Sequence, residues 1–211
     1  MGLEREHKWL VAAFPDVARL MAAFAAVGAE LRYAAEREQH DTYFDTLERE
    51  LQDAGAALRV RRFGGETLAT YKGPGAVVGS LHTREEIEVS FAEPPALPAV
   101  AWPEAVSAKL IALGVETTEL RPVLDLYTTR TRYLLHGSDA NSGFAPLAEL
   151  SFDEVRAAHD ERRVQFRELE LEALPDTPDA ELTRLGAALA PFDCTPHESD
   201  KLTYALSLLG I

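Results

Sequence analysis

The chain has 211 residues and a single cysteine, Cys194. One thiol excludes both an intrachain disulfide framework and a cluster of thiolate ligands around a metal ion. No apolar run approaches the length needed to cross a bilayer, and the first residues are acidic where a secretory signal would be basic. We therefore expect a cytoplasmic protein, and its apolar content of 46% is enough to build a sizeable core.

The chain is also short of positive charge. It has 21 Lys and Arg residues against 35 Asp and Glu residues, which gives a formal net charge of −14 at pH 7. Nucleic acids and anionic membranes bind net basic surfaces, so this balance argues against both as general partners. A local basic pocket that binds a small molecule remains compatible with it. The sequence does not indicate an oligomeric state.

Alternating polar and apolar residues predict about eight strands, most of them in sequential hairpins. We expect strands over 2–11, 31–44, 57–63, 66–73, 82–91, 124–136, 146–155 and 162–174, and helices over 15–30, 104–113, 178–190 and 197–209. Gly64-Gly65 predicts a tight hairpin, and turns are expected at KGPG (72–75) and at 137–143. Closing such a meander removes its exposed edges. The expected fold class is therefore α+β, an eight-stranded antiparallel β-barrel with flanking helices, as a single domain over 1–211.

Charged side chains recur at every second residue on several of these strands, so they share one face of each strand. For any single strand, the simpler explanation is a sheet with one solvated face. The faces are nevertheless segregated by sign, with Arg59 and Arg61 on one strand and Glu168, Glu170 and Glu172 on another. Like charges repel, which makes such faces poor solvent surfaces. If the helices cover the apolar faces, the charged faces line the barrel, where they require water, a metal ion and an anion.

The first strand places Glu4, Glu6 and Lys8 on one face. Carboxylate oxygens are the ligands that Mg²⁺ and Mn²⁺ prefer, so Glu4 and Glu6 are candidate metal ligands. Lys8 would then contact a phosphate. Arginine dominates the basic strands, and its planar guanidinium suits bidentate recognition of phosphate.

This ordered set of motifs resembles the CYTH superfamily, also called triphosphate tunnel metalloenzymes. Glu4-x-Glu6-x-Lys8 matches the ExExK signature of that family. The further motifs follow in order along nearly the whole chain: YFDT (43–46), LRVRR (58–62), TYKGP (70–74), REEIEV (84–89), TRTRY (129–133), AELSFDEV (148–155), FRELELE (166–172) and Lys201 in HESDKLTYAL. One departure is Ser199-Asp200-Lys201, because the family has an adjacent Ser-Lys pair at this point.

The resemblance implies a tunnel that binds a triphosphate compound together with Mg²⁺ or Mn²⁺. Carried over by position, the metal ligands would be Glu4, Glu6, Asp153, Glu168 and Glu170. The triphosphate contacts would be Lys8, Arg59, Arg61, Lys72, Arg130, Arg132 and Lys201. The catalytic group would be Glu4, Glu6, Lys8, Arg59, Arg61 and Lys72. Glu86 and Glu88 would be additional tunnel acids, for a second metal ion or for positioning water.

The activity that the resemblance implies is metal-assisted hydrolysis, with in-line attack of water on the terminal phosphorus. Inorganic triphosphate is the first expected substrate, cleaved to pyrophosphate and phosphate, because a chain of this size shows no obvious machinery for a base or a thiazole. Thiamine triphosphate hydrolysis and the reaction of class IV adenylate cyclases are the alternatives. A non-enzymatic polyphosphate-binding module is a third, and it would be marked by missing metal ligands.

Overall fold

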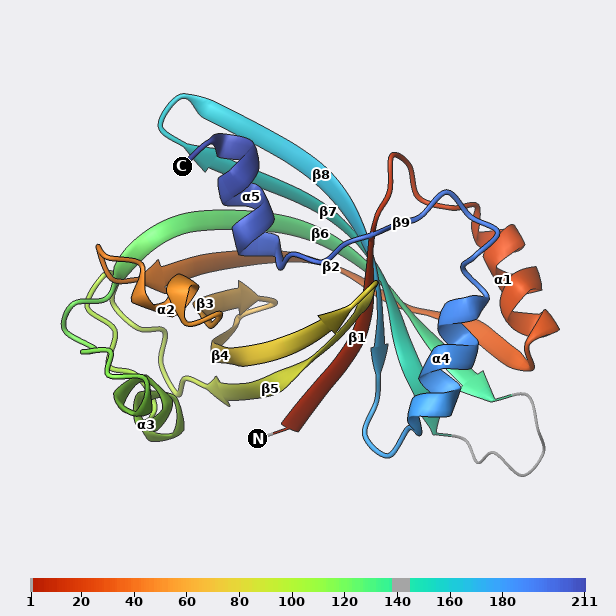
Figure 1. Ribbon diagram of the computed structural model, residues 1–211, viewed down its shortest axis with the longest axis horizontal. Helices are drawn as coiled ribbons and strands as arrows, with labels where there is room; N and C mark the ends of the chain where they lie inside the picture. The colour runs from red at the N-terminus through yellow and green to blue at the C-terminus, as the bar shows by residue number, and fades with distance from the viewer. Residues whose placement is uncertain (1, 138–144) are drawn as a thin grey trace.

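The computed structural model describes residues 2–137 and 145–211 (Figure 1). The turn predicted at 137–143 lies outside the described residues from position 138 onward. The elements in chain order are β1 (Gly2–Leu10), α1 (Val17–Ala26), β2 (Ala29–Asp45), α2 (Glu50–Asp53), β3 (Ala57–Phe63), β4 (Glu66–Val78), β5 (Leu81–Ser90), α3 (Glu104–Ala112), β6 (Arg121–Gly137), β7 (Pro146–His159), β8 (Arg162–Ala173), α4 (Asp179–Ala187), β9 (Thr195–Pro196) and α5 (Lys201–Leu209).

The strands form one antiparallel sheet in the order β5-β4-β3-β2-β6-β7-β8-β1, with the short β9 added beside β1. Strand β5 also pairs with β1, from Gly2 opposite Glu86 to His7 opposite Leu81. This pairing closes the sheet, and the predicted eight-stranded barrel with flanking helices is confirmed. Closure leaves none of the eight long strands as an edge of the sheet. No helix in the described part of the chain is both long and apolar enough to cross a membrane.

The turn predicted at residues 72–75 was wrong. These residues lie inside β4, which runs on to Val78, and the register with β5 shifts between Lys72 and Gly75. The irregularity is a β-bulge, in which the strand bends without reversing. It requires glycine at position 75, because a Cβ there would lie 2.5 Å from the Thr83 carbonyl oxygen. The hairpin predicted at Gly64-Gly65 is confirmed between β3 and β4, and both glycines have positive φ.

The helices are shorter than the sequence pattern indicated. The helix predicted over 15–30 is α1, which begins after the N-cap Asp16 and gives way to β2 at Ala29. The helix predicted over 197–209 is α5, which begins only at Lys201 because Asp200 is its N-cap. The Asp200 side chain accepts a hydrogen bond from the Thr203 backbone N–H at 2.8 Å. Lys201 therefore occupies the first turn of α5.

Helices cover the outward faces of the barrel in two places. Helices α1 and α4 lie together at one end of the molecule, whereas α2 and α3 lie at the other (Figure 1). Leu20 and Phe24 of α1 and Leu182 and Leu185 of α4 share a core cluster with outward-facing residues of β6, β7 and β8. Val106 and Leu110 of α3 belong to a second cluster with β3, β4 and β5. The apolar strand faces thus point outward onto helices, as the charge pattern predicted.

Helix α5 packs differently, because it covers inward-facing residues. It lies against β6, β7 and β8 (Figure 1), and Leu202 and Leu206 share a core cluster with Leu126, Val155 and Phe166. Each of these three strand residues lies on the same face as the charged residues farther along its strand, since they differ by an even number of positions. Helix α5 therefore closes one end of the barrel with an apolar layer.

Candidate functional site

A polar cavity of about 200 Å³ lies inside the barrel. Among its described lining residues, Ala57 and Leu174 are the aliphatic side chains and Tyr43 is the aromatic one. The predicted site residues that line it are Glu4, Glu6, Lys8, Arg59, Arg61, Lys72, Glu86, Glu88, Arg130, Arg132, Glu170 and Lys201. Asp153 and Glu168 lie behind this wall with no exposed surface. The fold brings all the predicted site residues to one place, while their roles remain predictions.

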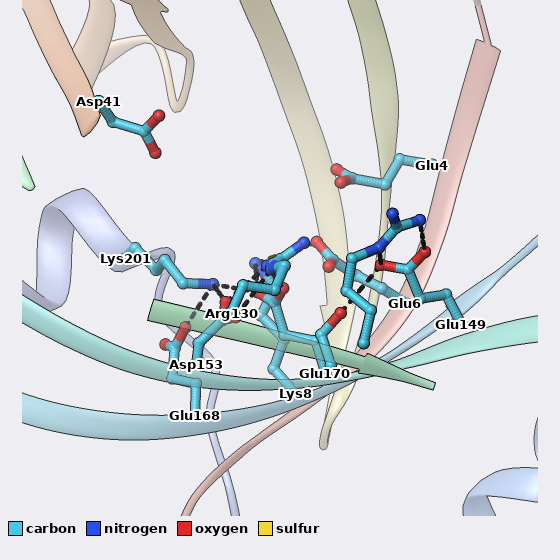
Figure 2. Close-up of polar contacts among 12 residues, drawn as sticks. Glu4, Glu6, Lys8, Asp41, Arg130, Glu149, Asp153, Glu168, Glu170 and Lys201 are labelled. Carbon is cyan, nitrogen blue, oxygen red and sulfur yellow. Dashed lines mark hydrogen bonds and ion pairs between the residues drawn. The ribbon is translucent and has the colours of Figure 1, made fainter. Parts of the chain in front are cut away.

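Lys201 stands at the centre of a buried acidic group. Its Nζ lies 2.9 Å from Asp153 Oδ2, 2.7 Å from Glu168 Oε2 and 2.5 Å from Glu170 Oε1 (Figure 2). Arg130 contacts Asp153 through two nitrogens and also reaches Glu170. The extra residue Asp200 therefore does not remove Lys201 from the cavity. Its placement in the first turn of α5 directs the side chain to these carboxylates.

The cations keep this acidic group ionised. Burial alone would raise the pKa of Glu170, but the charges of Lys201, Arg130 and Lys8 hold that pKa well below its usual range. Burial likewise opposes ionisation of Lys201, and its three carboxylate partners raise the pKa of its ammonium well above the usual value. At these distances the attraction between opposite charges outweighs the cost of desolvation, both for the Glu170 carboxylate and for the Lys201 ammonium. The group is thus a set of fixed charges at pH 7.

A second acidic group lies on the β1–β5 side of the cavity and contains Glu4, Glu86 and Glu172. Glu4 Oε1 is 2.5 Å from Lys72 Nζ, and Glu4 Oε2 is 2.8 Å from Arg84 Nε. Glu172 makes no hydrogen bond or ion pair with any other described residue. Burial, together with the charges of Glu6, Glu4 and Glu86, raises the pKa of Glu172 to about 8. This carboxylate thus lacks the positive partner that its neighbour Glu4 has.

Four of the five predicted metal ligands are divided between two acidic groups. Asp153, Glu168 and Glu170 offer oxygens within 4.8 Å of one another, and so do Glu4, Glu86 and Glu172. Glu6 belongs to neither group and pairs with Lys8 at 3.0 Å and with Arg84 at 3.4 Å. Oxygen-only donors suit a hard divalent cation such as Mg²⁺. Lys72 lies 2.5 Å from Glu4 and 3.3 Å from Glu86, but Glu172 has no ion-pair partner among the described residues. In the first group, Lys201 contacts all three carboxylates, so the second group fits such an ion better.

The basic wall formed by β3 depends on an acid that the sequence analysis missed. Arg61 donates to both oxygens of Asp41 at 2.7 Å, and Arg59 Nη1 lies 3.7 Å from the same carboxylate. Asp41 is buried and lies on β2, apart from the Lys201 cluster (Figure 2). The signal was present as the alternation Arg37-x-Gln39-x-Asp41-x-Tyr43. The alternation of side chains along the strand at 31–44 places Asp41 on the same face as these residues.

Several other residues of the site carried a weaker signal. Arg84, Glu149 and Glu172 lie on charged strand faces that the sequence revealed, and they line the cavity without having been assigned a role. His197 gave no signal. Its Nδ1 lies 2.8 Å from Glu168 Oε1, and its backbone N–H donates to the Lys8 carbonyl at 3.0 Å. His197 therefore links the segment before α5 to β1 and to the buried acidic group.

Comparison with solved structures supports the fold. A protein from Hippeastrum, described as "putative adenylyl cyclase HpAC1" with a dominant triphosphatase activity, matches with a TM-score of 0.65 and 17% identity over 98% of this chain and 96% of that chain. A "putative adenylate cyclase" from Bacillus halodurans matches with a TM-score of 0.62 and 20% identity over 97% of this chain and 98% of that one. At these identities the likeness shows a shared fold.

Sequence comparison gives the family. "Putative adenylate cyclase MJ0240" of Methanocaldococcus jannaschii is 37% identical over 60 residues, or 28% of this chain and 34% of that protein. The match thus spans about a third of the length of that curated relative. The model of the CYTH domain matches residues 3–186, which is most of the chain and includes the strands that line the cavity. The chain therefore belongs to the CYTH domain family.

Proposed function

We propose that this protein is a metal-dependent triphosphatase whose preferred substrate is inorganic triphosphate. The observation that carries the proposal is the cavity wall, where Lys8, Arg59, Arg61, Lys72, Arg130, Arg132 and Lys201 surround the same small space as two groups of carboxylates. Cations alone would bind an anion. Cations together with oxygen ligands for a divalent ion would also support attack on a phosphorus atom.

The polarity of the wall supports inorganic triphosphate over larger triphosphates. A base or a thiazole would need an apolar or aromatic surface, as ligand pockets usually provide. The described lining offers Ala57, Leu174 and the Tyr43 ring, and the Tyr43 hydroxyl accepts a hydrogen bond from Arg59 Nη1 at 3.4 Å. Thiamine triphosphate and ATP are therefore the second choices.

In the proposed mechanism, the chain holds the substrate through its guanidinium and ammonium groups. Arg59, Arg61 and Lys72 neutralise the charge that develops on the phosphoryl oxygens. A bound Mg²⁺ or Mn²⁺ would supply charge neutralisation and a more acidic water, with Glu4, Glu86 and Glu172 as the best-placed ligands. Glu6 and Lys8 hold each other at 3.0 Å, so Lys8 is oriented toward the cavity before substrate arrives.

The first experiment is a parallel assay of phosphate release from inorganic triphosphate, thiamine triphosphate and ATP, with Mg²⁺, with Mn²⁺ and with a chelator. We expect metal-dependent release that is fastest with inorganic triphosphate. Each of Arg59→Gln and Arg61→Gln should lower the rate by about 10²- to 10³-fold, the usual cost of a group that stabilises transition-state charge. Full activity in the double variant Glu4→Gln/Glu172→Gln would contradict the metal-site assignment.

Adenylate cyclisation is the second candidate, because the relatives from Methanocaldococcus jannaschii and Bacillus halodurans carry that name. The ATP reaction should therefore also be analysed for cyclic AMP and pyrophosphate. Their formation at a rate above that of phosphate release would replace the triphosphatase proposal. Binding of triphosphate with no turnover of any substrate would instead favour a binding module.

A further inference from the structure

Arg37 of β2 lines the cavity, and the sequence analysis did not identify it. Every other lysine and arginine that lines the cavity has a carboxylate within 4.0 Å. Arg37 has none among residues 2–137 and 145–211. Glu149, which also lines the cavity, is held by Arg132 through a two-nitrogen contact. Arg37 is thus a tunnel cation whose charge is not balanced by an ion pair within the described chain.

The groups that contact Arg37 directly are neutral, and the charges near it are those of Arg130, Arg132 and Arg61 and the opposite charge of Glu149, which Arg132 already pairs. Its guanidinium carbon lies 4.5 Å from the centre of the Phe63 ring. With the Gln39 amide oriented so that its oxygen faces the guanidinium, Gln39 accepts hydrogen bonds from Arg37 Nε at 2.5 Å and Nη2 at 2.8 Å. Directly across the β2–β6 pair, Arg37 faces Arg130. Like charges opposite one another on a sheet are destabilising, so this arrangement costs the protein stability when no anion is bound.

Arg37 lies toward the end of the barrel opposite α5. Tyr43, on the same face of β2, belongs to the apolar cluster of α5, and six residues of strand between the two positions span on the order of 20 Å. Arg132, the neighbouring cation on β6, has a side chain that is 29% exposed, compared with 7% for Lys201 in the first turn of α5. The Arg37 end of the cavity is therefore open to solvent.

We propose that Arg37 is a further substrate-binding residue, and that together with Arg132 it forms a phosphate-binding position at this open end of the tunnel. The proposal rests on the triphosphatase function proposed above and extends its phosphate contacts to a residue on β2. Phe63 and Gln39 hold the guanidinium in place before an anion arrives, and an arriving phosphate supplies the negative charge that the described chain does not. Burial and the charges of Arg130, Arg132 and Arg61 lower the pKa of Arg37 to about 10, which leaves it charged at pH 7.

The test is the binding of tripolyphosphate, measured by titration calorimetry in the presence of chelator so that no turnover occurs. Arg37→Gln should weaken binding by about 10- to 100-fold, as expected for the loss of a charge-assisted contact. Arg37→Lys keeps the charge but not the planar guanidinium, so it should weaken tripolyphosphate binding less than Arg37→Gln does. The matched control is Arg32→Gln, which removes the same charge from an exposed pair with Glu30 on the same strand and should bind as the wild type does.

Thermal denaturation without ligand separates binding from a structural role. If Arg37 serves an anion, the free Arg37→Gln variant should melt at the wild-type temperature or above it, because a repulsive charge has been removed. A lower melting temperature with unchanged tripolyphosphate affinity would make Arg37 a structural residue and overturn the proposal. Equal affinity of Arg37→Gln and wild type would overturn it as well, and the triphosphatase assignment would stand. A wild-type protein that neither binds nor cleaves tripolyphosphate would overturn both.

Discussion

At the scale of single residues, the interior of this barrel depends on the balance of buried charges. Lys201 contacts Asp153, Glu168 and Glu170, all within 3.0 Å. Removing one partner from such a set leaves buried carboxylates uncompensated, which costs far more than an exposed ion pair contributes. The effect of substituting a lysine should therefore depend on where its ammonium lies.

We expect Lys201→Met to lower the free energy of unfolding by about 3–5 kcal/mol at pH 7, the usual cost of breaking a buried ion pair. The control is Lys109→Met, whose ammonium pairs with Glu85 on the surface at 2.8 Å. That change should cost less than about 1 kcal/mol. Urea denaturation of both variants measures the difference, and equal losses would mean that Lys201 is not buried among these carboxylates.

Glu172 gives a prediction about how stability depends on pH, because its pKa is raised where those of Glu4 and Glu170 are lowered. Its pKa rises from 4.5 to about 8 on folding, through burial and the charges of Glu6, Glu4 and Glu86. The folded protein therefore binds a proton that the unfolded chain releases, and this group makes stability fall as the pH rises from 4.5 to 8. Glu172→Gln cannot ionise and should avoid that loss.

In chelator, Glu172→Gln should equal the wild type in stability near pH 4.5 and exceed it at pH 8 by on the order of 2 kcal/mol, since partial exposure of the side chain limits the full linkage value. Denaturant titrations across this range measure the gap. The control Glu66→Gln, at an exposed position in the β3–β4 hairpin, should show no such trend. A gap that stays constant with pH would refute the raised pKa.

The sequence pattern located cavity-lining residues where charges alternate with clear apolar partners. Glu4, Arg59, Arg130 and Glu170 were found in this way, because a strand shows its two faces directly in the sequence. Arg37 and Asp41 escaped notice because β2 mixes charged, amide and aromatic side chains on its inward face. His197 could not be found by periodicity, since it lies in the irregular segment before α5 and reaches Glu168 only through tertiary folding.

At the scale of elements, the bulge in β4 shows where local signals mislead. Gly and Pro together favour a turn, and KGPG contains both. In the folded chain Pro74 occupies a bulge, where the missing N–H is tolerated, and Gly75 allows β5 to approach closely. What decides between a turn and a bulge is whether the strand finds its partner on both sides, and that information lies in β5, outside the motif.

Gly75→Ala should therefore disturb the site from a distance. The added Cβ would lie 2.6 Å from Arg84 Cβ and 2.5 Å from the Thr83 carbonyl oxygen, so β5 must shift. We expect a loss of about 1–3 kcal/mol in stability, the usual cost of overpacking, with a lower rate of triphosphate hydrolysis because Arg84 holds Glu4 at 2.8 Å.

The matched control is Gly73→Ala, two residues away in the same bulge. Its Cβ would meet the Tyr71 ring at 3.5 Å, which is ordinary van der Waals contact. Denaturation and activity of this variant should stay near wild type. Equal effects at both positions would show that the bulge as a whole, and not the approach of Arg84, sets the outcome.

At the scale of the whole molecule, closure of the barrel was predictable from the need to pair edge strands. The position of the closed end was not predictable, because α5 has the sequence of an ordinary amphipathic helix. Its contacts with inward-facing Leu126 and Phe166 show that it covers the barrel interior. That residues 1–211 form a single domain remains a prediction. Lysine, arginine and carboxylate side chains all line the cavity, so the free protein carries charges of both signs at close range there.

An anion that pairs with the cavity cations and a metal ion that pairs with the cavity carboxylates should together stabilise the folded protein. In the proposed function, tripolyphosphate would bind the cations, and Mg²⁺ would bind the acidic group of Glu4, Glu86 and Glu172. At a concentration 100 times its dissociation constant, a ligand specific for the folded state adds about 2.7 kcal/mol, or roughly 5–10 °C in melting temperature for a chain of this size. Calorimetry should show this rise with Mg²⁺ and tripolyphosphate together, and a smaller rise with either alone. The double variant Arg59→Gln/Arg61→Gln should lose most of it. A rise of the same size in that variant would place the bound anion outside the barrel.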